Sequence, residues 1–146
     1  MGDTDFSTER LLEQASGNQS AIFLTALRWA RDREGSVDGW ASFIGEQFAD
    51  GWSSMREAGA RDVARMAGLN FACSADSKFV ALEGDAARAE AVIDGPDPEW
   101  LSETGVSVED HDRANELIFG RIAEHLGLSF ESHRDPHGLH LTFSRT

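Results

Sequence analysis

Residues 107–145, SVEDHDRANELIFGRIAEHLGLSFESHRDPHGLHLTFSR, decide the fold class, because a helical pattern changes there into a strand pattern. Ser107 begins a motif that resembles a capping box, with Asp110 in the place of the usual Glu, and it predicts a helix start. Apolar residues at three- and four-residue steps predict that this helix continues to about residue 126. These residues are Ala114, Leu117, Ile118, Ile122 and Leu126. Gly127 predicts the helix end.

The end of the same stretch predicts a β-hairpin. Residues 128–134 and 139–145 have the composition of two strands. The four residues between them, Asp-Pro-His-Gly at 135–138, suit a type I turn, which favours Asp first, Pro second and Gly last.

A second hairpin is predicted before this helix. The apolar run at 79–82 precedes Glu-Gly-Asp at 83–85, which is a turn signal. The alanines of residues 86–93 favour a helix, but alternation places every second apolar residue on one side, and we predict a strand. Residues 94–98, Asp-Gly-Pro-Asp-Pro, are a predicted loop.

The first 70 residues contain no proline, and we predict that they are helical. The expected helices cover residues 7–15, 19–34, 36–55 and 58–67, with a break at Gly17-Asn18. The order of helices, hairpin, helix and hairpin predicts an α+β fold with a small antiparallel sheet and helices over one face. We expect one domain over residues 1–146, with a helical part at 1–70 and an α+β part at 71–146.

Composition excludes several functional classes. The chain has 26 acidic residues against 13 Lys and Arg, a net charge of −13, so nucleic acid is not an expected partner. The acidic excess over residues 74–110 forms either a solvated rim or a cation-attracting surface. The single cysteine excludes an intrachain disulfide. With no signal peptide and no apolar run near about 20 residues, we expect a cytoplasmic protein with no membrane partner.

An aromatic stripe runs along the predicted helix over 36–55 at three- and four-residue steps. Its candidate ligand-binding residues are Trp40, Phe43, Phe48, Trp52 and Met55. The stripe is either plain core or the wall of a pocket, because pockets for small molecules are mainly apolar with a few polar groups. Glycines within it would allow a neighbouring helix or a ligand to approach closely.

The C-terminal hairpin carries a candidate metal site. If residue 135 pairs with residue 138, His133 lies opposite His140, and Glu131 lies opposite Thr142. His133, His140 and Glu131 would then form a site with two histidines and one carboxylate. Two alternatives remain: proline in the turn favours a bulge that separates the pair, or the histidines belong to an exposed polar face.

Asp110-His111-Asp112 is a second cluster of interest. A carboxylate beside an imidazole raises the pKa of the ring and can make a general acid–base, with His111 and Asp110 as the catalytic candidates. However, successive helix residues point in different directions, and acidic residues are also favoured at a helix N-terminus. Helix capping is therefore the alternative interpretation.

The second half of the chain resembles a known layout. It runs from FVALEGDAARAEAVIDGPDPEWLSETGVSVEDHDRANELIF through IAEHLGLSFESHRDPHGLHLTF, within residues 60–145. This order resembles the L-2-amino-thiazoline-4-carboxylate hydrolase-like family and, more distantly, the vinyl-reductase-type (TRAPP-like) small-ligand domains. The resemblance implies their fold and the enclosure of a small, largely apolar molecule. Asp94, Asp110 and Thr142 stand roughly where those families have cysteines, which counts against inherited cysteine chemistry.

Three hypotheses follow. The first is a domain that binds a small, largely apolar organic molecule in an aromatic-lined pocket, or a divergent hydrolase-like enzyme that acts on it. The second is a metal-dependent enzyme built on the hairpin site, and only this one requires a cofactor, a divalent metal ion. The third is a non-catalytic interaction module whose aromatic stripe packs on a partner or on its own copy, the latter giving a homodimer.

Overall fold

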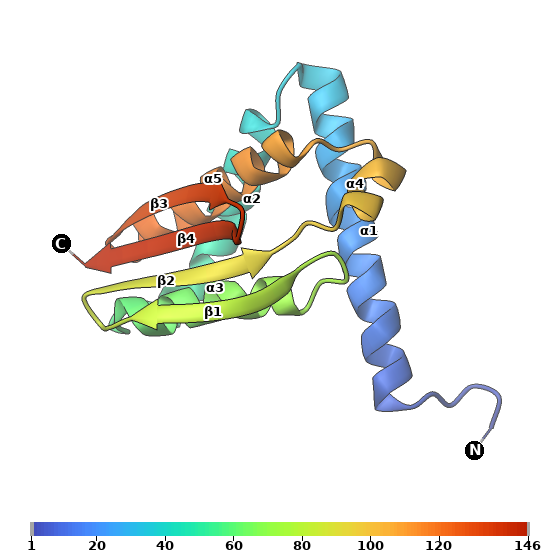
Figure 1. The fold of residues 1–146 in the computed structure, drawn as a ribbon, viewed down its shortest axis with the longest axis horizontal. Coiled ribbons are helices and arrows are strands. Elements are labelled where there is room, and N and C mark those ends of the chain that lie inside the picture. The colour runs from blue at the N-terminus through green and yellow to red at the C-terminus, as the bar shows by residue number, and fades with distance from the viewer. Residues whose placement is uncertain (1, 146) are drawn as a thin grey trace.

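The computed structural model describes residues 2–145, which form five α-helices, one 3₁₀ helix and four strands (Figure 1). The helices are α1 (Thr8–Glu34), α2 (Asp38–Ala49), η1 (Asp50–Met55), α3 (Ala60–Ala72), α4 (Pro98–Thr104) and α5 (Val108–His125). The strands are β1 (Lys78–Gly84), β2 (Arg88–Asp94), β3 (Leu128–Asp135) and β4 (Gly138–Arg145). The predicted α+β fold with a helical N-terminal half is confirmed.

The two hairpins join into one antiparallel sheet with the strand order β1-β2-β4-β3. The second strand of each hairpin lies in the centre, where β2 and β4 pair from Arg88↔Ser144 to Ile93↔Leu139. Segments that are distant in the sequence therefore share the two faces of a single sheet.

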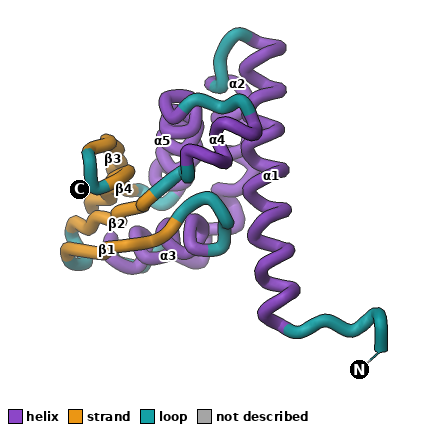
Figure 2. The backbone as a smooth tube through the Cα atoms, turned by 45° about the vertical axis from the view of Figure 1, so that its right-hand side comes forward, coloured by secondary structure: helices purple, strands orange, loops and turns teal. Residues whose placement is uncertain are grey.

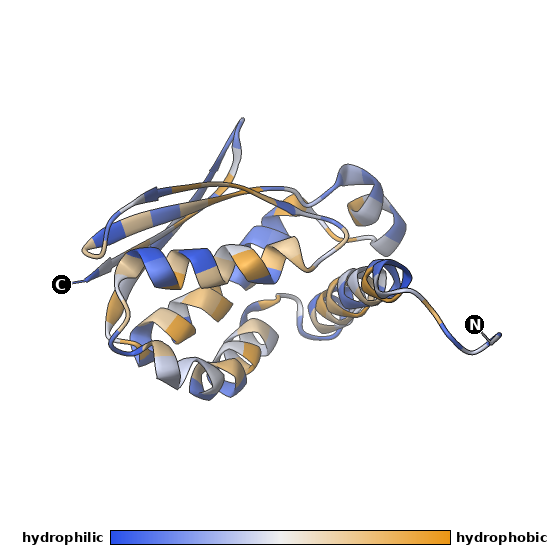
Figure 3. Cartoon of the chain, turned by 90° about the horizontal axis from the view of Figure 1, so that it is seen from below, coloured by the Kyte–Doolittle hydropathy of each residue, from blue (hydrophilic) through white to orange (hydrophobic). Residues whose placement is uncertain are grey.

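One face of the sheet carries the core. Alternate residues of the central strands are buried there: Ala89, Ala91, Ile93, Leu139, Leu141 and Phe143. Helices α3 and α5 contact the strands. Figure 3 shows them on one side of the sheet, and no described helix covers the other face. The open face carries the residues that alternate with the core residues along each strand. The hairpin histidines lie on this face.

Helix α2 packs on α5 through small residues, Ala41, Gly45 and Ala49. A Cβ atom at Gly45 would lie 2.9 Å from Cβ of Arg121 and 3.1 Å from Cα of Ile118. Glycine weakens a helix by about 1 kcal/mol relative to alanine. Here glycine allows α5 to approach α2 closely, which is one of the roles expected for the glycines of this stretch.

Helix α1 does not break at Gly17-Asn18, and that prediction is wrong. Glycine in a helix interior costs about 1 kcal/mol but is compatible with helical geometry. The side-chain amide of Gln14 also donates to that of Asn18 at 3.1 Å, along the same helix face. Figures 1 and 2 show that α1 lies beside the rest of the fold and that its N-terminal part extends beyond it.

Other helix boundaries also differ from the prediction. The helix expected over 36–55 is divided, because α2 ends at Ala49 and η1 continues as a 3₁₀ helix. The sequence analysis also missed α4, whose first turn is capped by the Asp97 side chain accepting from the backbone N–H of Glu99 at 2.8 Å. Within residues 2–145, no helix combines the length and the apolar character needed to cross a bilayer.

Candidate functional site

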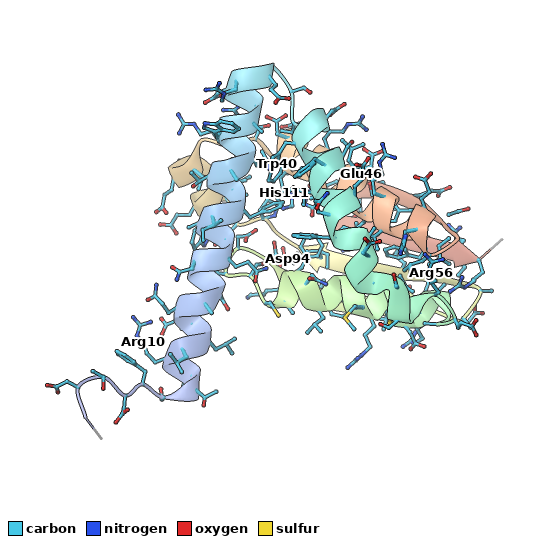
Figure 4. All side chains as sticks on the ribbon, turned by 180° about the vertical axis from the view of Figure 1, so that it is seen from behind. Arg10, Trp40, Glu46, Arg56, Asp94 and His111 are labelled. Atoms are coloured by element: carbon cyan, nitrogen blue, oxygen red, sulfur yellow. The ribbon has the colours of Figure 1, made fainter. Side chains whose placement is uncertain are left out.

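A cavity of about 80 Å³ lies where α1 meets the end of α3, the following loop and the first turns of α5. We call it the interhelical cavity. Its lining residues are Gln19, Ser20, Phe23, Asn70, Phe71, Ser74, Asp76, His111 and Asn115. Seen from behind, His111 lies in the region between α1 and α2 (Figure 4). Phenyl rings combined with a few buried polar groups are typical of small-molecule sites.

His111 supplies the most reactive group of this cavity. Its side chain is 2% exposed, and its ring packs edge-on against Phe71. Nδ1 lies 3.0 Å from Oδ1 of Asp112, and Nε2 lies 3.3 Å from the amide nitrogen of Asn115. A carboxylate at Nδ1 and an amide donor at Nε2 favour the tautomer with its proton on Nδ1. The lone pair on Nε2 then faces the amide of Asn115, which also lines the cavity.

Asp112, not Asp110, is the carboxylate partner of His111. The Arg134 side chain from β3 donates to Oδ1 of Asp112 at 2.9 Å and to the carbonyl oxygen of Gly95 at 2.7 Å. Burial raises the pKa of Asp112, but the hydrogen bonds and charges of Arg134 and His111 outweigh burial and hold that pKa below its ordinary value. The carboxylate is therefore kept ionised and fixed in position.

Asp110 has a different environment. Its carboxylate lies 3.4 Å from Nη1 of Arg31 on α1, and its backbone N–H donates to Oγ of Ser107 at 3.1 Å. Ser107 therefore caps α5, as the motif predicts, and the Asp110 carboxylate helps to join α5 to α1. The structure does not bring Asp110 to the ring of His111.

The opposite wall of the cavity holds a buried carboxylate that the sequence analysis missed. Ser20 on α1 donates its hydroxyl to Asp76, and Ser77 donates to the other oxygen of Asp76 at 3.0 Å. The backbone N–H of Ala75 donates to Oγ of Ser20 at 2.9 Å. One signal was present in the sequence: Ser20 precedes the apolar Leu24 by four residues, so a polar group lies on the buried helix face.

The aromatic stripe does not surround one shared cavity. Phe43 and Phe48 are 57% and 55% exposed. Trp52 packs edge-on against Phe119, with ring centroids 6.2 Å apart. Because α2 buries its small residues against α5, the side chains of Phe43 and Phe48 stay outside the core. Met55, the last residue of the stripe, is partly buried against the core.

Trp40 is the member of the stripe that lies beside α1. Its ring centroid is 5.6 Å from that of Phe23, which lines the interhelical cavity. Trp40 also lines an open apolar groove of about 540 Å³ along α1. The residues that share this groove are Ala21, Ile22, Thr25, Ala26 and Trp29.

The hairpin histidines form a second polar site, on the open face of the sheet. The unbulged register is the one observed: His133 lies opposite His140, and Glu131 lies opposite Thr142. The two imidazole rings stack with centroids 4.4 Å apart and planes 11° apart. Asp135, rather than Glu131, completes the group, because ligating atoms of His133, Asp135 and His140 all lie within 4.8 Å of one another. We call these three residues the hairpin cluster.

His140 lies between two carboxylates. Its Nδ1 is 2.9 Å from Oε1 of Glu90 on β2, and its Nε2 is 2.9 Å from Oδ1 of Asp135. Burial lowers the pKa of His140, but the contacts with the carboxylates of Glu90 and Asp135 and their charges outweigh burial and raise it above the ordinary value. The pKa of Asp135 is lowered mainly by its interaction with His140.

Comparisons with protein-family models, with curated proteins and with solved structures found no match to this chain.

Proposed function

We propose that the chain binds a small, largely apolar organic molecule in the interhelical cavity, with His111 as its main polar contact. The observation that supports this proposal is the buried imidazole of His111, which is held by Asp112 at Nδ1 and borders the cavity. The resemblance of the second half of the chain to families that enclose a small apolar molecule is a second reason for this proposal.

The cavity limits the class of ligand. Its volume of about 80 Å³ compares with roughly 30 Å³ for one water molecule in the liquid and about 300–1,000 Å³ for the pockets of drug-sized ligands. The ligand is therefore a molecule of a few heavy atoms. An apolar body would pack against Phe23 and Phe71. A hydroxyl or amine group would donate to Nε2 of His111 in place of the 3.3 Å contact from Asn115, whose amide also donates to the carbonyl oxygen of His111 at 2.9 Å. Short alcohols and amines fit this description.

The same arrangement supports proton transfer as an extension of the binding proposal. A histidine that is oriented by a carboxylate at Nδ1 can take a proton at Nε2, and the carboxylate stabilises the imidazolium that forms. Asp112 is held in place for this role by Arg134. A divergent hydrolase-like enzyme would use His111 to take the proton of a bound water molecule or hydroxyl.

Ligand-observed NMR would test the binding proposal with alcohols and amines of up to about six heavy atoms. His111→Gln should weaken binding about tenfold, which corresponds to one lost hydrogen bond. The matched control is His125→Gln at the other end of α5, whose ring contacts Oγ of Ser53 at 2.9 Å. Circular dichroism would establish that both variants fold. Equal binding to His111→Gln and to the unchanged protein would refute the proposal.

A second candidate function, self-association, has its own supporting observation on α1. Ile22 and Trp29 are 71% and 58% exposed on the apolar groove. A seam with alternating four- and three-residue steps, typical of helix–helix packing, passes through both of them. Its members are Leu11, Ala15, Asn18, Ile22, Thr25 and Trp29. Over residues 11–27 the only charged residue is Glu13, and charge depletion marks interface cores.

The partner that fits this seam is a second copy of the same helix. Light scattering during size-exclusion chromatography should then give a dimer for the unchanged protein and a monomer for Ile22→Glu. Val80→Glu is the matched control, because Val80 is 52% exposed on β1, outside this seam. A monomer at all concentrations, or dissociation by both substitutions, would exclude this function.

A further inference from the structure

We propose that the hairpin cluster of His133, Asp135 and His140 is a binding site for a divalent transition-metal ion of the zinc type, with Glu90 orienting His140. This inference is independent of ligand binding in the interhelical cavity. It also changes the metal site expected from the sequence, since Asp135 replaces Glu131 as the carboxylate ligand.

The hairpin supplies the three ligands from neighbouring positions. His133 and His140 are direct cross-strand partners, and Asp135 follows His133 by two residues, a spacing that returns to the same face of a strand. Their ligating atoms lie within 4.8 Å of one another. Four-coordinate zinc, with ligand distances near 2.0–2.1 Å, needs ligand atoms about 3.3 Å apart. Small side-chain rotations would close this difference, and His133 is exposed and free to make one.

Glu90 prepares His140 for this role. Nδ1 of His140 lies 2.9 Å from Oε1 of Glu90, and the hydroxyl of Thr142 donates to Oε2 of the same carboxylate at 3.3 Å. Metal-binding histidines usually donate their other ring N–H to a carboxylate, which fixes the tautomer and the ring orientation. With the Nδ1 proton directed to Glu90, the Nε2 atom of a neutral ring carries a lone pair.

That Nε2 atom has no hydrogen-bond partner among the described residues, although it is buried. Oδ1 of Asp135 lies only 2.9 Å away, but the contact does not have the geometry of a hydrogen bond. Two acceptor atoms at this distance repel each other unless a positive charge lies beside both of them. A proton on Nε2 supplies that charge when the ring is protonated, and a metal ion bound to Nε2 and to Asp135 would supply it in place of the proton.

The surrounding face is suited to a cation. One cross-strand row of the sheet consists of Glu83, Glu90, Thr142 and Glu131, and the adjacent row holds His140 and His133. Three glutamates therefore border the cluster on one side. Two nitrogen ligands with one carboxylate suit zinc, copper or nickel, whereas calcium and magnesium prefer oxygen ligands alone. Three protein ligands would leave the fourth position of a zinc ion to water or to a substrate.

Calorimetric titration of chelator-treated protein with zinc chloride alone would test this proposal. We expect one zinc ion per chain, with binding at least tenfold weaker for His133→Ala and for Asp135→Asn. The amide oxygen in Asp135→Asn can still accept from the backbone N–H of His137, which Asp135 binds at 2.8 Å, so the turn should persist. Glu90→Gln should weaken binding about 10–100-fold if Glu90 orients His140.

The matched controls are Glu131→Gln and His137→Ala, because Glu131 lies on the same sheet face and His137 lies on the turn, both outside the cluster. Both should bind zinc within about twofold of the unchanged protein. Cobalt should give a visible absorption band in the unchanged protein that His133→Ala lacks. Failure of the unchanged protein to bind zinc would overturn the proposal. An equal loss of binding in Glu131→Gln would also overturn it.

Discussion

The interhelical cavity and the hairpin cluster both pair a histidine with a carboxylate, but they differ in the second ring nitrogen. In the cavity, Nε2 of His111 faces the amide of Asn115 at 3.3 Å. In the hairpin cluster, Nε2 of His140 has no hydrogen-bond partner among the described residues and faces the carboxylate of Asp135. Without a ligand, the first ring therefore has a protein partner at each nitrogen, one of them the long contact with Asn115, whereas the second has a position that a cation would complete.

This difference separates two roles of a buried polar group. An isolated polar group costs free energy inside a protein, and a complete network removes that cost and fixes the geometry. The network of His111, Asp112 and Arg134 joins α5 to β3 and contributes to stability. Without metal, the hairpin cluster contributes less to the free energy of unfolding, because the side chain of His133 is exposed.

The largest expected effect is the loss of the carboxylate that joins the cavity to the sheet. Asp112→Ala leaves Arg134 and His111 without their partner, and breaking such a buried pair typically costs about 3–5 kcal/mol. Because Asp112 is partly exposed, we expect a cost near the lower end of that range, about 3 kcal/mol. Asp110→Ala breaks one contact of 3.4 Å with Arg31 rather than a network and should cost less than about 1 kcal/mol. Urea unfolding would measure the loss of unfolding free energy in each variant. Equal losses would contradict the larger role that we assign to Asp112.

The next effect tests the hairpin cluster through stability. Zinc at 100 times its dissociation constant should raise the free energy of unfolding by about 2.7 kcal/mol, because it binds only the folded chain. His133→Ala should remove this gain while changing the metal-free stability by less than about 0.5 kcal/mol, as expected for an exposed side chain. Thermal unfolding with and without zinc chloride would measure both. His137→Ala is the control that should keep the gain.

A smaller effect is expected from pH at Asp112. Its pKa is lower in the folded protein than the value near 3.9 of an unfolded chain. The ionised form therefore stabilises the fold above about pH 4, and this contribution is lost as the pH falls through the folded pKa. The stability gap between the unchanged protein and Asp112→Asn should narrow from pH 6 to about pH 3. Urea unfolding at several pH values would test this, and a constant gap would contradict the assignment.

The sequence predicts the hairpin cluster better than the cavity, for a physical reason. A turn of four residues fixes the pairing of the two strands, so the positions of His133 and His140 follow from Asp135 and Gly138. Glu131, the carboxylate expected from the sequence, lies two residues before His133, and Asp135 lies two residues after it, so spacing alone does not separate them. Asp135 was placed in the turn, although it also lies on the same face as His133.

The cavity could not be predicted in the same way, because its polar groups come from separate segments. Ser20 lies on α1, Asp76 on a loop and His111 on α5. Arg134, which holds the carboxylate partner of His111, lies on β3. No spacing along the chain connects them, and their contacts depend on how α1 packs against the rest. Most elements follow from periodicity, caps and turns, although α4 and the continuous α1 do not. The packing of α2 through small residues, with Phe43 and Phe48 exposed, does not follow either.

The smallest expected effect concerns α1, which contributes Ser20 to the cavity and no residue to the hairpin cluster. Gly17 is helical, and a Cβ atom there would meet nothing within 4 Å. Gly17→Ala should therefore stabilise the helix locally by about 0.8–1 kcal/mol. Because the N-terminal part of α1 extends beyond the fold (Figure 1), global unfolding should change by less than this. Hydrogen exchange at residues 12–16 should slow about fivefold.

The same substitution distinguishes the two sites. If α1 is continuous, the more stable helix of Gly17→Ala should leave zinc binding at the hairpin cluster unchanged. It should maintain or strengthen ligand binding in the interhelical cavity, which Ser20 lines. A chain that breaks at Gly17-Asn18 requires a non-helical glycine, and alanine there would weaken the fold rather than slow exchange. Faster exchange in Gly17→Ala would therefore contradict a continuous α1, and altered zinc binding would contradict the independence of the two sites.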